Sequence, residues 1–441
     1  MQLSVQQEIA IKKTMSLCPE CRQQIPADVF ETDGKVFLRK RCPQHGNFTV
    51  LINSDRRFYY ESCGAGCACQ TTVGHSDDII EKAATCIALI EIVESCNLKC
   101  PTCYADSPFT VPADIKALSL DEFRSRVNAV IDRKGPLDIL QLSGGEPTIH
   151  PQFLQLLEGV LADKRVGYTL INTNGLLLAG DDDFVEKLGE LHQAHRRFEI
   201  YLQFDGPQEA GQVALRGVDL RKVRQKAIER TGRHGIPTTL AMTVTDDNSG
   251  ELGGTLRYGL AQPSVRGITF QPMFFSGRTH HRFPDPSPTG HSLPVQTARR
   301  LNVADIALGI IEQSEGLLSE KDFTPLPCGD PNCHMISYVL RKNGQWLPVS
   351  HFVDFSTVQG FLKDRVDFDI EDLKKCGCES EPLGQILKQF EIGPDHVFRL
   401  FIKPFMDAWT YDQDRIDRCC VHVIGEGGKL ESFCRHYALQ S

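Results

Sequence analysis

The sequence lacks any apolar run long enough to cross a membrane, because nowhere in its 441 residues do 18 apolar residues follow one another. Its start, MQLSVQQEIAIKKTM, has no long apolar core followed by a small-residue cleavage site, as secretory signals do. Strong net charge is also missing, and the formal value of -9 gives no general attraction to nucleic acid or to anionic lipid surfaces. We therefore expect a cytoplasmic protein without a transmembrane segment and without a nucleic-acid partner.

Internal repeats and low-complexity tracts are absent as well, and 41% hydrophobic with 24% charged residues describes an ordinary globular chain. Its 441 residues suffice for two or three domains. Cysteine, in contrast, is abundant: there are 17, but none between Cys103 and Cys328. Since a reducing compartment disfavours structural disulfides, these grouped thiols indicate metal or cluster ligation.

The cysteine-free middle of the chain alternates short apolar runs with longer amphipathic ones, which is typical of a parallel sheet covered by helices. A capping box, Ser119-Leu-Asp-Glu122, opens the first of these helices, which we expect to run to about Arg133. The pattern predicts an α/β fold, a partial TIM-like barrel of six βα units. Its strands are expected at residues 88–93, 138–142, 168–171, 198–204, 238–244 and 268–273.

The predicted organisation has three parts. Residues 1–87 form a Cys-rich amino-terminal region, residues 88–290 form the α/β core, and residues 291–441 form a second Cys-rich region after a Pro-rich linker at 283–294. Parallel α/β sheets place their chemistry at the carboxyl ends of the strands, where the polar and glycine-rich motifs of the core stand. We expect these motifs to converge on one site.

Three cysteines lie within eight residues directly after the first core strand: Cys96, Cys100 and Cys103, at C-x3-C-x2-C spacing. Thiolates are the ligands of iron–sulfur clusters, and three of them can hold a [4Fe–4S] cluster while one iron stays open for a substrate. A zinc knuckle, or unrelated cysteines in a turn, would be the alternatives.

This loop, with the aromatic Tyr104 directly after it, resembles that of the radical S-adenosylmethionine (AdoMet) superfamily. Ser143-Gly144-Gly145-Glu146-Pro147 is similar to the superfamily's GGE motif, whose backbone and carboxylate hold the amino group of the methionine moiety. The resemblance also implies contacts to the ribose and carboxylate of AdoMet from Thr173, Asn174, Gln203 and Asp205, at the ends of the third and fourth strands. Polar residues at strand ends can instead simply cap the next turn, so both interpretations stay open.

The resemblance further implies that a [4Fe–4S] cluster cleaves AdoMet reductively, which gives methionine and a 5′-deoxyadenosyl radical that takes hydrogen from an unactivated carbon. Because the cofactors carry this step, we expect no catalytic side chain beyond the cluster ligands. The protein has to supply a closed, mostly apolar cavity. A reduced flavodoxin or ferredoxin is the expected electron donor, by analogy.

Cys18-Pro-Glu-Cys21 and Cys42-Pro-Gln-His45 form two knuckles around an expected hairpin at residues 35–38, and this spacing suits a mononuclear tetrahedral site. Zinc ribbons and rubredoxin-like iron sites both use such turns, so the identity of the metal, zinc or iron, stays open. The predicted ligands are Cys18, Cys21 and Cys42, with His45 or Cys63 as the fourth.

Two further groups of cysteines predict auxiliary iron–sulfur clusters. The first is a glycine-rich segment with Cys63, Cys67 and Cys69, followed by Cys86. The second, near the carboxyl terminus, consists of Cys328, Cys333, Cys419, Cys420 and Cys434. Cys376 and Cys378 lie in the same region and are interpreted as spares.

The rubredoxin-like amino-terminal part, together with the segments Pro327–His334, Cys419–His422 and Phe433-Cys434, resembles the tetraether lipid synthase-like family over nearly the whole chain. That resemblance implies carbon–carbon bond formation on a lipid-like substrate. Phe274, Phe275, Phe401 and Phe405 would then line an apolar tunnel, unless they are core residues. The alternative is a radical methylase of a small heterocycle such as a pterin, with AdoMet as radical source and methyl donor. A non-enzymatic zinc-binding scaffold is a remote alternative.

Overall fold

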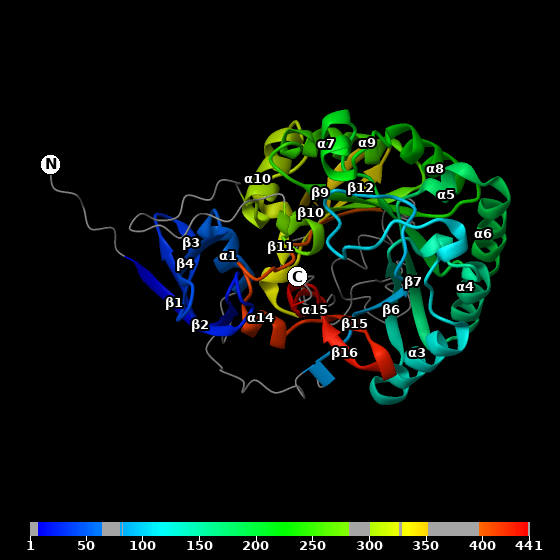
Figure 1. The fold of residues 1–441 in the computed structure, drawn as a ribbon. Coiled ribbons are helices and arrows are strands. Elements are labelled where there is room, and N and C mark those ends of the chain that lie inside the picture. The colour runs from blue at the N-terminus through cyan, green and yellow to red at the C-terminus, as the bar shows by residue number, and fades with distance from the viewer. Residues whose placement is uncertain are drawn as a thin grey trace.

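The structure, a computed structural model, describes residues 8–63, 80–81, 83–281, 300–325, 329–351 and 397–439, and of residues 60–63 and 280–281 it describes only the backbone. A small antiparallel sheet lies beside a large α/β body (Figure 1). Among the described residues, no helix combines the length and the apolar character that a membrane crossing requires.

The amino-terminal sheet consists of four antiparallel strands in chain order: β1 (Ile9–Leu17), β2 (Gln24–Thr32), β3 (Lys35–Cys42) and β4 (Gly46–Asn53). The hairpin expected at residues 35–38 is not there, because these residues lie within the single strand β3, which pairs with β2 on one side and with β4 on the other. Asp33 and Gly34 connect β2 to β3 with φ angles of 52° and 72°, which match the tight two-residue turns that join twisted strands. The helix α1 (Arg56–Cys63) follows the sheet.

The large sheet has six neighbouring parallel strands in its centre, which confirms the predicted α/β fold. They are β5 (Ile87–Val93), β6 (Leu137–Gly144), β7 (Val166–Thr173), β8 (Phe198–Gln203), β9 (Thr238–Val244) and β10 (Val265–Pro272). The helices that connect these strands form the outer layer of the body (Figure 1). They are α3 (Leu120–Lys134), α4 (Phe153–Ala162), α5 (Leu176–Gly180), α6 (Asp182–His195), α7 (Glu209–Arg216), α8 (Arg221–Arg233) and α9 (Leu252–Ala261).

The helix α3 shows why these segments fold as predicted. Ser119 is its N-cap, and the Ser119 side chain accepts a hydrogen bond from the backbone N–H of Glu122 at 3.1 Å. Its buried residues, Phe123, Val127 and Val130, recur every three or four positions and therefore lie on one face of the helix. That face packs into the core that also contains the outward-facing residues of the strands.

The carboxyl-terminal region joins the same sheet at both edges. β14 (Val397–Ile402) pairs in parallel with β10, and β15 (Val421–Ile424) pairs in parallel with β5. Beyond them, β12 (Met335–Lys342) and β16 (Leu430–Ser432) add antiparallel strands. In the described parts of the chain, no ladder joins the two outer edges into a closed barrel.

The remaining elements named here are β11 (Thr324–Pro325), β13 (Gln345–Pro348), α10 (Val303–Gln313), α14 (Gln413–Asp417) and α15 (Phe433–Leu439). The linker expected at residues 283–294 lies outside the described residues.

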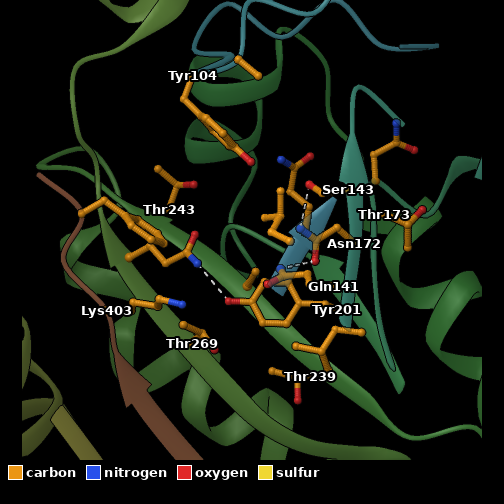
Figure 2. Close-up of a pocket in the computed structure, with 18 of the residues that line it drawn as sticks. Tyr104, Gln141, Ser143, Asn172, Thr173, Tyr201, Thr239, Thr243, Thr269 and Lys403 are labelled. Atoms are coloured by element: carbon orange, nitrogen blue, oxygen red, sulfur yellow. Dashed lines mark hydrogen bonds between the residues drawn. The ribbon is translucent and has the colours of Figure 1, made fainter. Parts of the chain in front are cut away.

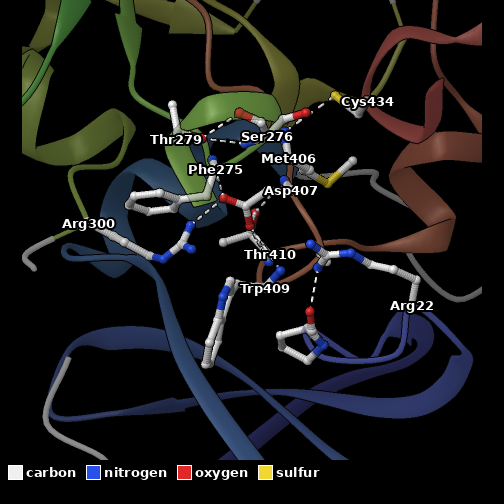
Figure 3. A network of polar contacts seen from close by, with 12 residues as sticks. Arg22, Phe275, Ser276, Thr279, Arg300, Met406, Asp407, Trp409, Thr410 and Cys434 are labelled. Carbon is white, nitrogen blue, oxygen red and sulfur yellow. Dashed lines mark hydrogen bonds and ion pairs between the residues drawn. The ribbon is translucent and has the colours of Figure 1, made fainter. Parts of the chain in front are cut away.

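Buried polar contacts hold the amino-terminal sheet against the carboxyl-terminal region. Lys40 Nζ donates to the backbone oxygen of Trp409 at 2.8 Å. Asp407, two residues before, accepts from the backbone N–H of Phe275 at 2.8 Å and from Arg300 Nη1 at 2.5 Å (Figure 3). Since Phe275 follows β10, this network connects the small sheet to the strand ends of the large one.

We expect Asp407→Asn to lower the free energy of unfolding by about 3–5 kcal/mol, because it leaves the buried Arg300 guanidinium without an anionic partner. Burial acts to raise the pKa of Asp407, but Arg300 and the backbone donors outweigh it and hold this pKa below its usual range. The advantage of the wild type over the variant should therefore be full near neutral pH and shrink as the pH falls below about 4. Urea denaturation at neutral and acidic pH measures both effects.

The matched control is Asp132→Asn, whose side chain is 74% exposed and which should change stability by less than about 0.5 kcal/mol. Equal stability of the two variants would contradict the role assigned to Asp407.

Candidate functional site

A cavity opens at the carboxyl ends of the parallel strands (Figure 2). Because side chains alternate between the two faces of a strand, every second residue points into it, and on β8 these residues are Glu199, Tyr201 and Gln203. Most of the predicted site residues line this cavity: Cys96, Cys100, Cys103, Tyr104, Gly144, Gly145, Glu146, Thr173, Asn174 and Gln203. The motifs that were expected to converge therefore do lie in one place.

The loop with Cys96, Cys100 and Cys103 begins where β5 ends, and its own backbone holds it. Cys96 N–H donates to Pro108 O, and Thr110 N–H donates to Cys96 O, both at 2.9 Å. Cys96 and Cys100 are buried, whereas Cys103 is half-buried. Burial, together with the neighbouring negative groups, raises the pKa of Cys96 to about 12.

Two arginines face the sulfur atoms of this loop. Arg216, at the end of α7, lies close enough to Cys100 to interact electrostatically with its sulfur, and Arg278, which follows β10, does the same with Cys103. The charge around the sulfurs is one of the means by which a protein stabilises and tunes an iron–sulfur cluster. The three thiols and the two guanidinium groups therefore fit a [4Fe–4S] cluster at this position.

The turn at residues 143–147 packs directly against the cluster loop, and its glycines make this possible. A Cβ atom on Gly144 would lie 2.1 Å from Val93 O, and one on Gly145 would lie 2.1 Å from Ser95 O. Gly144 also has a φ of 122°, which a residue with a side chain rarely adopts. The glycines thus allow a close approach of the backbone that leads into the cluster loop. The contact of their own backbone to AdoMet, which the resemblance implies, stays a prediction.

The Glu146 carboxylate is buried and is satisfied by the protein itself. Its Oε1 accepts from Thr148 Oγ1 at 2.6 Å and from Thr173 Oγ1 at 2.7 Å, and its Oε2 accepts from Asn174 N–H at 2.7 Å. Burial raises the pKa of Glu146 in spite of these hydrogen bonds. The carboxylate thus ties the end of β6 to the end of β7, and the contact to AdoMet expected from it stays a prediction.

The other predicted AdoMet contacts also have partners within the protein. Asn174 Nδ2 donates to Asn97 Oδ1 in the cluster loop at 2.7 Å, and Gln203 Oε1 accepts from Arg224 at 3.2 Å. The contacts to AdoMet expected from Thr173, Asn174 and Gln203 stay predictions, and all three residues line the cavity from which they would be made.

Asp205 is placed differently from the rest. It is fully buried, has a φ of 63°, and is not among the residues that line the cavity. Its two carboxylate oxygens accept from Arg216 at 2.6 and 2.7 Å. Asp205 therefore orients the guanidinium that contacts Cys100. The sequence did not reveal Arg216, because no spacing rule links a helical arginine to a cysteine more than a hundred residues earlier.

A second group of ligands lies in the amino-terminal sheet. The Sγ atoms of Cys18, Cys21 and Cys42 and a ring nitrogen of His45 lie within 4.8 Å of one another. The sulfurs of Cys21 and Cys42 are 3.9 Å apart. Two sulfurs bound to one tetrahedral zinc at about 2.3 Å would be about 3.8 Å apart. The four residues thus fit a mononuclear metal site, with His45 as the fourth ligand among the described side chains.

Four carboxyl-terminal thiols gather beside the cavity: Cys333, Cys419, Cys420 and Cys434. Burial raises the pKa of Cys333 to about 11, that of Cys434 to about 12, and that of Cys420 well above its usual range. The neighbouring Cys419 acts in the same direction on all three. Lys403, which lines the cavity, interacts electrostatically with all four. This group of thiols could hold a metal cluster of its own.

The other predicted ligands are less well placed. Cys67, Cys69, Cys328, Cys376, Cys378 and the side chain of Cys63 lie outside what the structure describes. Cys86 is buried and takes part in a disulfide bond. A sulfur in a disulfide is not a thiolate ligand, so the structure argues against Cys86 in the predicted auxiliary cluster, which stays a prediction for Cys63, Cys67 and Cys69.

Two family models match the chain. The Radical SAM superfamily model matches residues 90–258, and the HMPTM N-terminal zinc ribbon domain model matches residues 10–54. The first segment contains the cluster loop and the GGE motif, and the second contains the four-ligand site. Residues 90–258 therefore form a radical SAM domain, as the cluster loop and the GGE motif predicted, and residues 10–54 form a zinc ribbon, one of the two interpretations left open for that part. A radical SAM domain implies an enzyme that uses a [4Fe–4S] cluster and AdoMet.

Among its relatives is a protein of Methanocaldococcus jannaschii named 7,8-dihydro-6-hydroxymethylpterin dimethyltransferase, which is 27% identical over 97% of this chain and 94% of that protein. A tungsten-containing aldehyde ferredoxin oxidoreductase cofactor-modifying protein of Pyrococcus furiosus is 29% identical over 38% of this chain and 46% of that protein. The solved structure of native anSMEcpe with bound AdoMet and Cp18Cys peptide is 21% identical, with a TM-score of 0.34, over 42% of this chain and 50% of that chain.

The packing of the GGE turn gives a direct test of the site. Gly145→Ala should lower AdoMet cleavage roughly a hundredfold, because a methyl group at this position forces the turn away from the cluster loop, and a displacement of about 1 Å has such an effect on bound reactants. Release of 5′-deoxyadenosine after anaerobic reconstitution measures it, with the iron content determined in parallel.

Gly159→Ala is the matched control, because a Cβ atom there would meet nothing closer than 4.0 Å and the residue lies within the helix α4. Cleavage at the wild-type rate by Gly145→Ala would contradict the close packing described here.

Proposed function

We propose that this protein is a radical methylase that acts on a reduced pterin. The observation that carries the proposal is the cavity, in which the cluster loop and the GGE motif share one space with a row of polar strand residues. The relative from Methanocaldococcus jannaschii supports it, since its name specifies a dihydropterin as the compound that is methylated and the alignment extends over both the zinc ribbon and the core.

The lining of the cavity argues against a lipid chain as the substrate. Phe274, Phe401 and Phe405 do line it, as expected for a tunnel, but Phe275 packs under the Arg300 guanidinium instead. Polar side chains line much of the remaining surface: Gln141, Asn172, Tyr201, Thr239, Thr269 and Gln271. Hydrogen bonds among these groups and to neighbours such as Glu199 use only part of their donors and acceptors. An alkyl chain would leave the remaining donors and acceptors without partners, at about 1–3 kcal/mol each. A flat heterocycle with N–H and C=O groups along its edge can satisfy them, which favours the pterin alternative.

Bound at Cys96, Cys100 and Cys103, a [4Fe–4S] cluster would supply the electron that splits AdoMet into methionine and a radical able to remove hydrogen from an unactivated carbon. The chain's own residues position the reactants. Arg216 and Arg278 lie beside the sulfurs of Cys100 and Cys103. The aromatic rings of Phe274, Phe433 and Tyr437 pack around Tyr104, which lines the cavity.

Further cofactors belong to the same proposal. We assign an auxiliary iron–sulfur cluster to Cys333, Cys419, Cys420 and Cys434, because these four thiols lie near one another and beside Lys403. The ribbon ligands Cys18, Cys21, Cys42 and His45 are assigned to zinc. The electron donor is assigned as a reduced ferredoxin or flavodoxin, by analogy with other radical enzymes.

The test is to supply the reconstituted protein with dithionite, AdoMet and 7,8-dihydro-6-hydroxymethylpterin under anaerobic conditions and to follow 5′-deoxyadenosine and methylated pterin by mass spectrometry. We expect both products from the wild type and neither from Cys96→Ala/Cys100→Ala/Cys103→Ala. The triple variant should keep its zinc and the iron bound elsewhere. A long-chain diacyl phospholipid in vesicles, offered in a parallel reaction, should stay unmodified.

The outcomes separate the two levels of the proposal. Release of 5′-deoxyadenosine without methylation of the pterin would leave the radical chemistry in place and reject the substrate. Modification of the phospholipid would return the assignment to the lipid-like substrate.

A further inference from the structure

One wall of the cavity is polar where the interior of parallel barrels is normally filled by bulky branched side chains. Gln141 on β6, Asn172 on β7, Tyr201 on β8 and Gln271 on β10 all line the cavity (Figure 2). Asn172 and Tyr201 are neighbours in the register between β7 and β8. These four residues, here called the polar wall, therefore form one continuous group.

The polar wall is only partly satisfied by its own hydrogen bonds. Gln141 Nε2 donates to Asn172 Oδ1 at 2.7 Å, and Gln271 Nε2 donates to Tyr201 Oη at 2.9 Å. A carboxamide has two N–H donors and an oxygen that accepts twice. Within the part of the chain that the structure describes, the side chains of Gln141 and Gln271 make no other hydrogen bond. Each keeps one N–H and its carbonyl oxygen for a ligand in the cavity.

The surroundings of the polar wall indicate a flat, uncharged ligand. None of its four side chains carries a charge at neutral pH. Leu89 on β5 and Leu170 on β7 stand on either side of Gln141 in the strand registers, and both line the cavity. Such an arrangement offers apolar surface to the faces of a ring and hydrogen bonds to its edge.

We propose that the polar wall recognises the 2-amino-4-oxopyrimidine edge of the substrate ring, an inference that rests on the proposed pterin substrate. This edge presents an acceptor nitrogen, an amino group, an N–H group and a carbonyl oxygen in a row. The amide groups of Gln141 and Gln271 can donate and accept at the same time, as such an edge requires. The polar wall thus determines which ring is bound and how it is turned, and it takes no part in the radical step.

Two variants each remove hydrogen-bonding groups while nearly keeping the volume of the side chain: Tyr201→Phe and Gln141→Met. Their matched controls are Tyr258→Phe on α9 and Gln155→Met on α4, two positions that do not line the cavity. All proteins are prepared as the full chain with reconstituted metals. Thermal unfolding and iron content show whether each variant is folded and loaded.

The measurement is equilibrium binding, in the presence of AdoMet and without reductant, of 7,8-dihydro-6-hydroxymethylpterin and of its analogue with oxygen in place of the 2-amino group. We expect the wild type and the controls to bind the 2-amino ring at least about tenfold more tightly than the analogue. Tyr201→Phe and Gln141→Met should weaken binding of the 2-amino ring about tenfold, and Gln141→Met should also lose most of the preference.

If these residues only packed against their neighbours, the variants would keep the preference for the 2-amino ring. An unchanged preference in both variants, with or without weaker binding, would therefore overturn the inference. Pterin would still be the proposed substrate in that case. If the wild type binds neither ring, the proposed function and this inference both fall.

Discussion

The close packing of the backbone at residues 144–145 against the end of β5 is the contact on which the rest of the site depends. Gly145 N–H donates to Val93 O at 2.7 Å, and Glu146 N–H donates to Ser95 O at 3.0 Å, one residue before the first cluster cysteine. The GGE turn and the cluster loop therefore cannot move independently. The Glu146 carboxylate extends this rigid unit to β7 through Thr173 and Asn174. The groups of this turn that are predicted to contact AdoMet are thus held in place before the cofactor binds, which lowers the conformational entropy lost on binding.

The positive charge near the sulfur atoms is also held in a fixed position on one side. Arg216 is buried, and its ion pair with the buried Asp205 offsets the desolvation of both groups. Because Asp205 takes two of the guanidinium N–H groups, it fixes the direction in which the remaining donors point, toward Cys100 and Thr243. Arg278 on the other side is only partly buried and contacts Cys103. A negatively charged cluster would therefore lie between Arg216, whose guanidinium is fixed, and Arg278, which is freer to move.

Local patterns in the sequence were sufficient for the parts of this structure that depend on neighbours along the chain. Alternating apolar and amphipathic runs predicted β5 to β10, and the spacing of Cys96, Cys100 and Cys103 predicted the cluster loop. The pairing of β14 with β10 and of β15 with β5 was not predictable, since short strands carry no mark of their partner. The proximity of Arg216 to Cys100 was not predictable either, because the two residues are far apart in the sequence and no local pattern links them. The polar lining of the cavity could be predicted in part, because Tyr201 of the polar wall and Gln203 alternate with buried apolar residues on β8. This alternation argues against the lipid tunnel that was inferred from the phenylalanines.

The carboxyl-terminal region, expected as a separate cluster-binding part, also forms one side of the cavity. β14 contributes Arg399 and Phe401 to the lining, Lys403 contributes directly after it, and Phe433 contributes from the start of α15. The same region presents Trp409 to Lys40 of the zinc ribbon and Asp407 to the backbone after β10. The ribbon site and the group of carboxyl-terminal thiols are therefore both connected, through packed residues, to the lining of the cavity. Unfolding of the ribbon would disturb the cavity through two hydrogen bonds, the one from Lys40 to Trp409 and the one from Phe275 to Asp407. The ribbon therefore supports the structure of the core.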